Sequence, residues 1–134
     1  MTPDASYLFG RVGPFGLLVP AAMVTHVFAE NAIAAPADAG AAIDLRALFC
    51  LDASQPGPHL ALRIGAAPAR LVVDHVASLH RLTDADFRPL PAAFDYARTA
   101  FDAVCRRPIE GVLALRLRRD PRFVPMAEWG AASA

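Results

Sequence analysis

Lysine is missing from this chain of 134 residues, and neither sign of charge prevails. All thirteen basic side chains are arginines, and thirteen acidic residues balance them, so the formal net charge is zero. Proteins that bind nucleic acids or anionic membranes through general electrostatics carry a net basic field. The balance therefore argues against nucleic-acid and membrane-surface partners.

Cysteine is scarce as well, since Cys50 and Cys105 are the only two and they form no CxxC pair. Both lie beside apolar residues, so we expect reduced thiols in a reducing compartment and no disulfide. The polar, acidic first residues lack the basic and apolar regions of a signal peptide. The longest weakly polar stretch, 15–28, is broken by Pro20 and is too short to span a bilayer. These features predict a cytoplasmic protein without membrane insertion.

Catalytic and metal-binding motifs are also absent: the sequence contains no HExxH, GxSxG, P-loop or GxGxxG. Its four histidines, at positions 26, 59, 75 and 80, do not show metal-ligand spacing, and we expect structural or surface roles for them. Cys105 precedes two arginines, which can lower the pKa of a thiol, but we favour a buried cysteine at a strand end. The sequence predicts no enzyme, no cofactor and no metal.

What the sequence does contain is 55% hydrophobic residues, in short runs separated by glycine and proline. The length and composition predict one domain over 1–134 with a substantial core. Strands are expected at 7–12 and 17–19 as a hairpin, and at 24–28, 41–45, 60–64, 70–79, 100–105 and 112–117. Helical turns are expected at 46–49 and, capped by Thr83, at 83–87. Residues 31–42 read as a loop. This pattern is typical of an all-β fold.

The most basic stretch lies near the end of the chain, at Arg116, Arg118, Arg119 and Arg122. A single-stranded nucleic-acid site would need aromatic rings around these arginines for base stacking, and few are near. We therefore interpret the stretch as a solvated edge strand guarded by charge.

Three segments carry a more specific pattern. Residues 43–49 place Asp44, Leu45 and Arg46 after an apolar residue; 71–82 place Asp74 between two apolar runs; and 87–91 contain Pro89 and Pro91. In this order and spacing the segments resemble the CheW-like domain of bacterial chemotaxis coupling proteins. The resemblance covers roughly residues 6–123.

The resemblance implies two small β-barrel lobes packed together, divided near 52–58 with strands shared, and a short tail at 124–134. It implies a non-enzymatic scaffold or adaptor in chemotaxis or a related pathway. Such a protein couples a chemoreceptor tip to the regulatory domain of a CheA-type histidine kinase, and no cofactor is implied. The family's Asn-Leu-Arg-Gly segment, which is tied to partner docking, is missing here between Pro36 and Ile43.

The missing segment directs the site prediction to the strand 24–28, which loses its usual neighbour. An uncovered apolar edge is a docking site or an aggregation hazard. We therefore expect contacts with a signalling protein or a second copy of the chain from one run of residues and one arginine: Val24, Thr25, His26, Val27, Phe28 and Arg46.

Structural roles are expected for the motif residues Asp44, Leu45, Asp74, Pro89 and Pro91, with Asp44 and Arg46 holding a corner. Two other classes stay open. One is a small β-barrel that binds a small ligand or single-stranded nucleic acid, and the other is an enzyme that uses Cys105 or a histidine.

Overall fold

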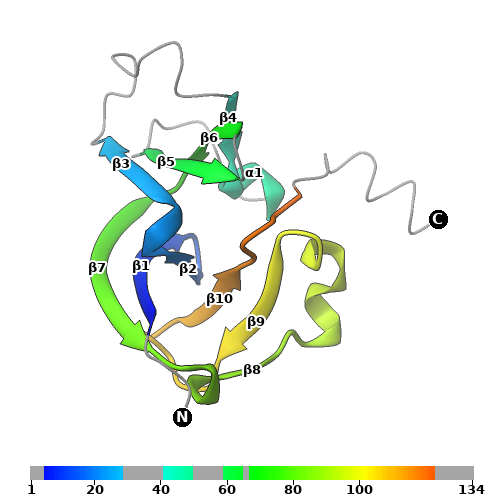
Figure 1. Cartoon of the computed structure of the whole chain (residues 1–134). Helices are drawn as coiled ribbons and strands as arrows, with labels where there is room; N and C mark the ends of the chain where they lie inside the picture. Colours follow the sequence, from blue (N-terminus) through cyan, green and yellow to red (C-terminus); the bar gives the residue numbers. More distant parts are fainter. Residues whose placement is uncertain (1–4, 29–40, 50–58, 65–66, 123–134) are drawn as a thin grey trace, which may run out of the picture.

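Two β-sheets make up the computed structural model, which describes residues 5–28, 41–49, 59–64 and 67–122 (Figure 1). The larger sheet has the strand order β7-β1-β2-β10-β9-β8, and the smaller sheet has the order β3-β5-β6-β4. The all-β prediction is confirmed. Among the described residues, no pairing joins the outer strands of either sheet, so the larger sheet curls without closing into a hydrogen-bonded barrel (Figure 1).

The strand bounds follow the glycine and proline punctuation of the sequence. The larger sheet contains β1 (Ala5–Val12), β2 (Phe15–Pro20), β7 (His75–Leu82), β8 (Phe87–Pro89), β9 (Phe101–Cys105) and β10 (Leu113–Leu117). The smaller sheet contains β3 (Val24–Phe28), β4 (Ala41–Asp44), β5 (His59–Ile64) and β6 (Ala67–Val72). The helical turns are η1 (Ala21–Met23), α1 (Leu45–Leu48), η4 (Asp84–Asp86) and η5 (Ala92–Ala97).

Several elements predicted from short sequence motifs are present in the structure. The predicted hairpin is β1 paired antiparallel with β2, and its turn is closed by Gly13 at φ 57°. The strand at 24–28 and the helical turn after Asp44 are confirmed. The capped turn is confirmed too, since the Thr83 amide donates to Asp86 Oδ2 at 2.8 Å. The predicted loop, lobe division and tail lie almost entirely in 29–40, 50–58 and 123–134, outside the described residues.

The chain changes sheets at residues 73–74, where the sequence suggested one continuous extended run. Strand β6 ends at Val72 in the smaller sheet, and β7 begins at His75 in the larger one. Val73 is fully buried at this point, and the Asp74 amide donates to the Arg11 carbonyl at 2.8 Å. This junction between β6 and β7 connects the two sheets, as η1 does between β2 and β3.

The arginine-rich stretch does not form an edge strand, and that interpretation is wrong. Strand β10, which carries Arg116, lies inside the larger sheet between β2 and β9. It pairs in parallel with β2, with Leu115 opposite Leu17. A parallel pairing between segments so far apart in the chain has no local signature, because it needs a long crossover and not a short turn.

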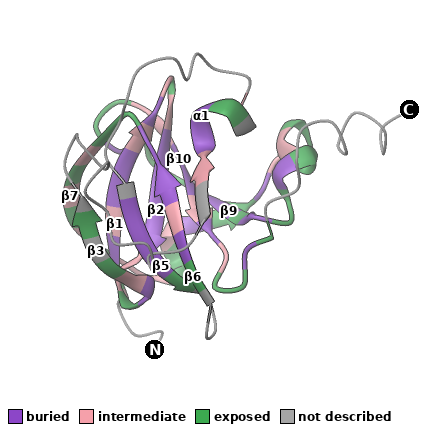
Figure 2. Cartoon of the chain, turned by 90° about the horizontal axis from the view of Figure 1, so that it is seen from above, coloured by how far each residue is buried: buried purple, intermediate pink, exposed green. Residues whose placement is uncertain are grey.

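Strand β2 is buried on both faces, which explains its continuous apolar run. Leu17 and Val19 pack into a core cluster that includes Leu60 and Leu71 of the smaller sheet. Leu18 points the other way, into a second cluster inside the curled sheet. Figure 2 shows this layering, with β2 buried along its middle and exposed positions along β7. The segments before and after residues 52–58 therefore both contribute strands to the smaller sheet and side chains to the same core cluster.

Candidate functional site

The corner between β4 and α1 is built from Asp44 and Arg46. Asp44 ends β4 in an extended conformation and caps α1, because its Oδ1 accepts from the Arg46 amide at 3.0 Å. The guanidinium of Arg46 donates two hydrogen bonds to the same carboxylate, from Nε to Oδ1 at 3.0 Å and from Nη2 to Oδ2 at 2.9 Å. Such a bidentate pair fixes the relative orientation of the two side chains and also stabilises the corner.

Asp74 completes the corner from the other sheet. Its Oδ1 lies 3.5 Å from Arg46 Nη1, and its Oδ2 accepts from the Gly13 amide at 2.6 Å. The carboxylate therefore connects α1, the β6–β7 junction and the β1–β2 turn. The Asp-Leu-Arg motif and the later aspartate, far apart in sequence, form one joint between the two sheets.

The charges at this joint shift each other's titration. Burial alone would raise the pKa of the Asp44 carboxyl, but the side-chain and backbone hydrogen bonds from Arg46 hold it below its ordinary value. The hydrogen bond to Asp44 raises the pKa of the Arg46 guanidinium, against the opposing effect of burial and with support from Asp74. Both groups are therefore ionised at neutral pH.

The burial of Arg46 corrects its assignment as a partner contact. The residue is 4% exposed, and its guanidinium is engaged by two carboxylates of its own chain. The side chain serves the corner and offers almost no surface to a partner. Leu45 beside it is fully buried in the core, whereas Pro89 ends β8 at the surface and Pro91 precedes η5.

Strand β3 forms one edge of the smaller sheet, and among the described strands it pairs only with β5. A bulge between Val24 and His26 shifts the register, and Thr25 Oγ1 donates to the Ala61 carbonyl at 3.2 Å. Val24 packs against the core, while Val27 is 50% exposed. The side chains of His26 and Phe28 lie outside the described residues, so the burial of side chains along β3 is described only for Val24, Thr25 and Val27.

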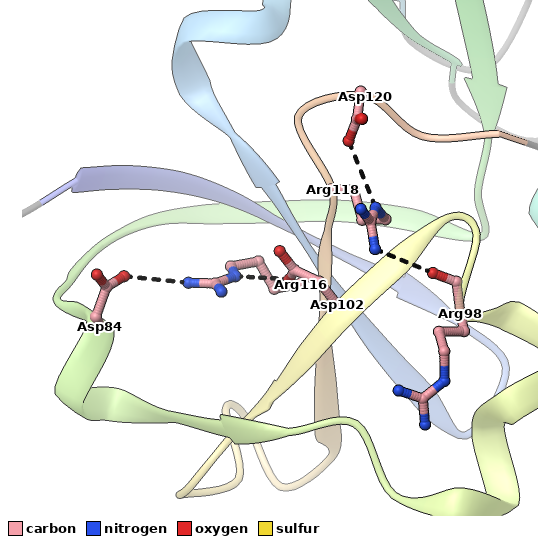
Figure 3. Close-up of polar contacts among 6 residues, drawn as sticks. All are labelled: Asp84, Arg98, Asp102, Arg116, Arg118 and Asp120. Atoms are coloured by element: carbon pink, nitrogen blue, oxygen red, sulfur yellow. Dashed lines mark hydrogen bonds and ion pairs between the residues drawn. The ribbon is translucent and has the colours of Figure 1, made fainter.

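Two of the four arginines near the chain end, Arg116 and Arg118, form ion pairs within the chain (Figure 3). Arg116 donates from Nε to Asp102 Oδ1 at 2.8 Å and from Nη1 to Asp84 Oδ1 at 3.4 Å. Its guanidinium also lies 4.4 Å from the centre of the Phe87 ring. Burial would lower the pKa of Arg116, but the hydrogen bond and charge of Asp102, together with Tyr7, outweigh it and raise the pKa.

Arg118, two residues after Arg116, is also hydrogen-bonded within the chain. It donates to Asp120 Oδ1 at 3.4 Å and to the Arg98 carbonyl at 3.5 Å (Figure 3). Sequence reasoning missed the partners of Arg116, because Asp102 and Asp84 lie far from it in the chain, whereas Asp120 lies only two residues from Arg118. Arginines paired in this way do not form an open phosphate-binding surface.

One polar cluster escaped the sequence reasoning although a signal was present. Ser78 Oγ lies 2.8 Å from His80 Nε2, since residues two apart on a strand share a face. Ser78 Oγ also lies 3.4 Å from Glu110 Oε2, but within the described part of the chain Glu110 makes no hydrogen bond to His80, as a catalytic triad would require. Cys105 is buried and free. Within the described residues no group of His, Cys, Asp and Glu can hold a metal.

No helix in the described part of the chain is both long and apolar enough to cross a membrane.

The arrangement of the two sheets is a CheW-like fold. It matches the solved structure of the scaffolding protein TtCheW from Thermoanaerobacter tengcongensis with a TM-score of 0.65, over 88% of this chain and 90% of that one. The two sequences are 12% identical, so the likeness is one of fold. No family model matches the sequence, and no curated protein matches it either.

Proposed function

We propose that the chain is a non-enzymatic scaffold that couples a receptor to a histidine kinase in the cytoplasm, in chemotaxis or a related signalling pathway. The observation that carries the proposal is the likeness to TtCheW, a scaffolding protein, across nearly all of both chains. Two features of the described residues agree with it. They contain no catalytic triad, and Arg116 and Arg118 near the chain end are paired with acids of the same chain.

The docking surface in this proposal is the outer edge of β3. Among the described strands β3 pairs on one side only, with β5, and Val27 adds an exposed apolar side chain. No residue of the strand is charged, so the edge lacks the lysines and inward charges that usually block strand addition. A partner segment can extend the sheet here, with main-chain bonds giving affinity and side-chain pockets giving specificity.

The candidate partners are the regulatory domain of a CheA-type histidine kinase and a chemoreceptor tip, or analogous signalling proteins. Calorimetric titration with each purified fragment tests them, with Val27→Arg as the variant. An arginine at Val27 should weaken binding about tenfold or more, because a charge would be desolvated at the contact. The matched control is Leu79→Arg, which changes an apolar residue on β7 that is more exposed than Val27, at 66%.

Three outcomes separate the parts of the proposal. Selective loss of binding in Val27→Arg supports both the coupling role and the β3 surface. If both variants bind with wild-type affinity, β3 is not the docking surface, but the proposed coupling role still stands. Absence of binding to every receptor and kinase fragment refutes the role itself. Sedimentation of the wild type as a dimer, converted to a monomer by Val27→Arg, would identify a second copy as the occupant of β3.

A further inference from the structure

An open cavity of about 480 Å³ lies beside the joint between the two sheets. Its lining comes from the end of β1 and the turn after it, from the β6–β7 junction, and from the turn between β9 and β10. The lining residues are Arg11, Gly13, Asp74, His75 and Glu110. Small-molecule sites usually enclose about 300–1,000 Å³ and place a few polar groups around the ligand. The cavity therefore has the volume of a small-molecule site, with charged and polar walls.

Arg11 brings a cation to the cavity that no acid of the described chain pairs with. Its guanidinium makes one hydrogen bond, from Nη2 to the Gly13 carbonyl at 3.4 Å. Arg11 lies directly opposite His75 in the antiparallel pairing of β1 with β7. Side chains at opposed positions share one face of the sheet, with Cβ atoms about 4.5–5.5 Å apart. Arg11 and His75 can therefore both donate hydrogen bonds to a single anionic group.

Glu110 brings an acid to the cavity from a strained turn. Two backbone hydrogen bonds, of 3.0 and 3.1 Å, join residues 109 and 112, so Glu110 and Gly111 form a two-residue turn. Their φ angles are 50° and 81°, in the left-handed region that favours glycine. Backbone strain at a residue other than glycine is concentrated at functional sites. The carboxylate accepts one hydrogen bond, from Ser78 at 3.4 Å, and keeps the rest of its capacity for a ligand.

The charges around the cavity define the kind of ligand. Asp74 is already engaged, because Arg46 lies 3.5 Å from its Oδ1 and the Gly13 amide donates to its Oδ2 at 2.6 Å. One charge of each sign then remains, on Arg11 and Glu110, and the two form no ion pair with each other. A molecule that bridges them carries an anion toward Arg11 and an ammonium toward Glu110, and is neutral overall. Since the lining has no apolar side chain, the rest of the molecule is small or polar.

We propose that this cavity binds a free α-amino acid with a small or polar, uncharged side chain. The carboxylate of the ligand accepts hydrogen bonds from Arg11 and His75, and its ammonium donates to Glu110. Charge-assisted contacts to two partly exposed groups imply a Kd of about 1 mM. The site lies apart from the β3 edge, and the inference does not depend on the proposed signalling function.

Chemical-shift titration by NMR tests the site, because it measures millimolar affinities. Glycine and L-glutamine are the probes, and each should shift the amide signals of Gly13, His75 and Glu110. N-acetylglycine lacks the ammonium and glycinamide lacks the carboxylate. Each of these two analogues should bind at least about tenfold more weakly than glycine, since one charge-assisted contact is lost.

Glu110→Gly separates binding from folding. Glycine adopts φ 50° without strain, so this variant should raise Tm by a few degrees and yet lose binding. Arg11→Gln should weaken binding about tenfold or more. Arg107→Gln is the matched control, because it removes an exposed arginine close to the same turn that does not line the cavity. This control should bind glycine as the wild type does.

The titrations give one supporting result and three that overturn the proposal. Binding of both probes that Glu110→Gly and Arg11→Gln remove and Arg107→Gln retains supports it. Binding of N-acetylglycine or glycinamide as tightly as glycine overturns it, because the cavity then recognises one charge alone. Wild-type affinity in Glu110→Gly overturns it, since the carboxylate then has no role. Absence of shifts at about 20 mM of either probe, roughly twenty times the expected Kd, overturns it too.

Discussion

Replacing Asp44 by asparagine removes one charge from the corner and little else. Asparagine matches aspartate in size and caps helices equally well, so the bond from the Arg46 amide is retained. What disappears is the bidentate ion pair to a guanidinium that is 4% exposed. Asp74 stays as the second carboxylate, at 3.5 Å from Nη1.

The expected loss follows from these contacts. A hydrogen bond to a charged group contributes about 1.5–3 kcal/mol, and a buried cation stripped of its partner costs about 3–5 kcal/mol. Because Asp74 compensates in part, we expect Asp44→Asn to destabilise the protein by about 2 kcal/mol, which lowers Tm by about 8 °C at this chain length. Asp44→Ala also loses the cap and should cost about 1 kcal/mol more.

The pH dependence gives a second, independent readout. The pKa of Asp44 lies below its ordinary value of 3.8 in the folded protein, so ionised Asp44 stabilises the fold fully above pH 3.8. This stabilisation is lost as the pH falls through the lowered, folded-state pKa. The stability difference between the wild type and Asp44→Asn should therefore be constant at neutral pH and should shrink at acidic pH below 3.8.

Urea denaturation followed by circular dichroism measures both effects. The control is Asp120→Asn, which makes the same chemical change in the pair with Arg118, where the Asp120 side chain is 84% exposed. Exposed pairs contribute about 0–1 kcal/mol, so this variant should unfold almost like the wild type. The reasoning fails if Asp44→Asn is no less stable than Asp120→Asn, or if its deficit persists unchanged at acidic pH.

Two further outcomes test the packing. Gly16→Ala should destabilise by about 1–3 kcal/mol, because its Cβ would lie 2.5 Å from Cε2 of the fully buried Phe9; wild-type stability in urea would contradict this. Cys105, 5% exposed, should react with a thiol reagent only on unfolding, and the intact mass without reductant should be that of two free thiols; a mass lower by two hydrogens would contradict the expectation for Cys50 and Cys105.

Much of the fold could be predicted because its signals are local. Gly13 and Pro14 gave the first hairpin, and the β-branched run gave the strand at 24–28. Asp44 gave the helical turn, since a capping carboxylate and its amide lie two residues apart. The bulge at Thr25 could not be predicted, because it depends on the register of β3 with β5.

By itself, the sequence determined the all-β class, most strand bounds and the corner pair Asp44–Arg46, since short-range sterics, capping and alternation act within a few residues. Only the tertiary structure decided that β10 lies inside the larger sheet, that Asp74 joins the Asp44–Arg46 corner, and that Arg116 pairs with Asp84 and Asp102. Each of these contacts joins segments far apart in the chain. Their geometry depends on how the sheets pack, and local pattern carries no information about that packing.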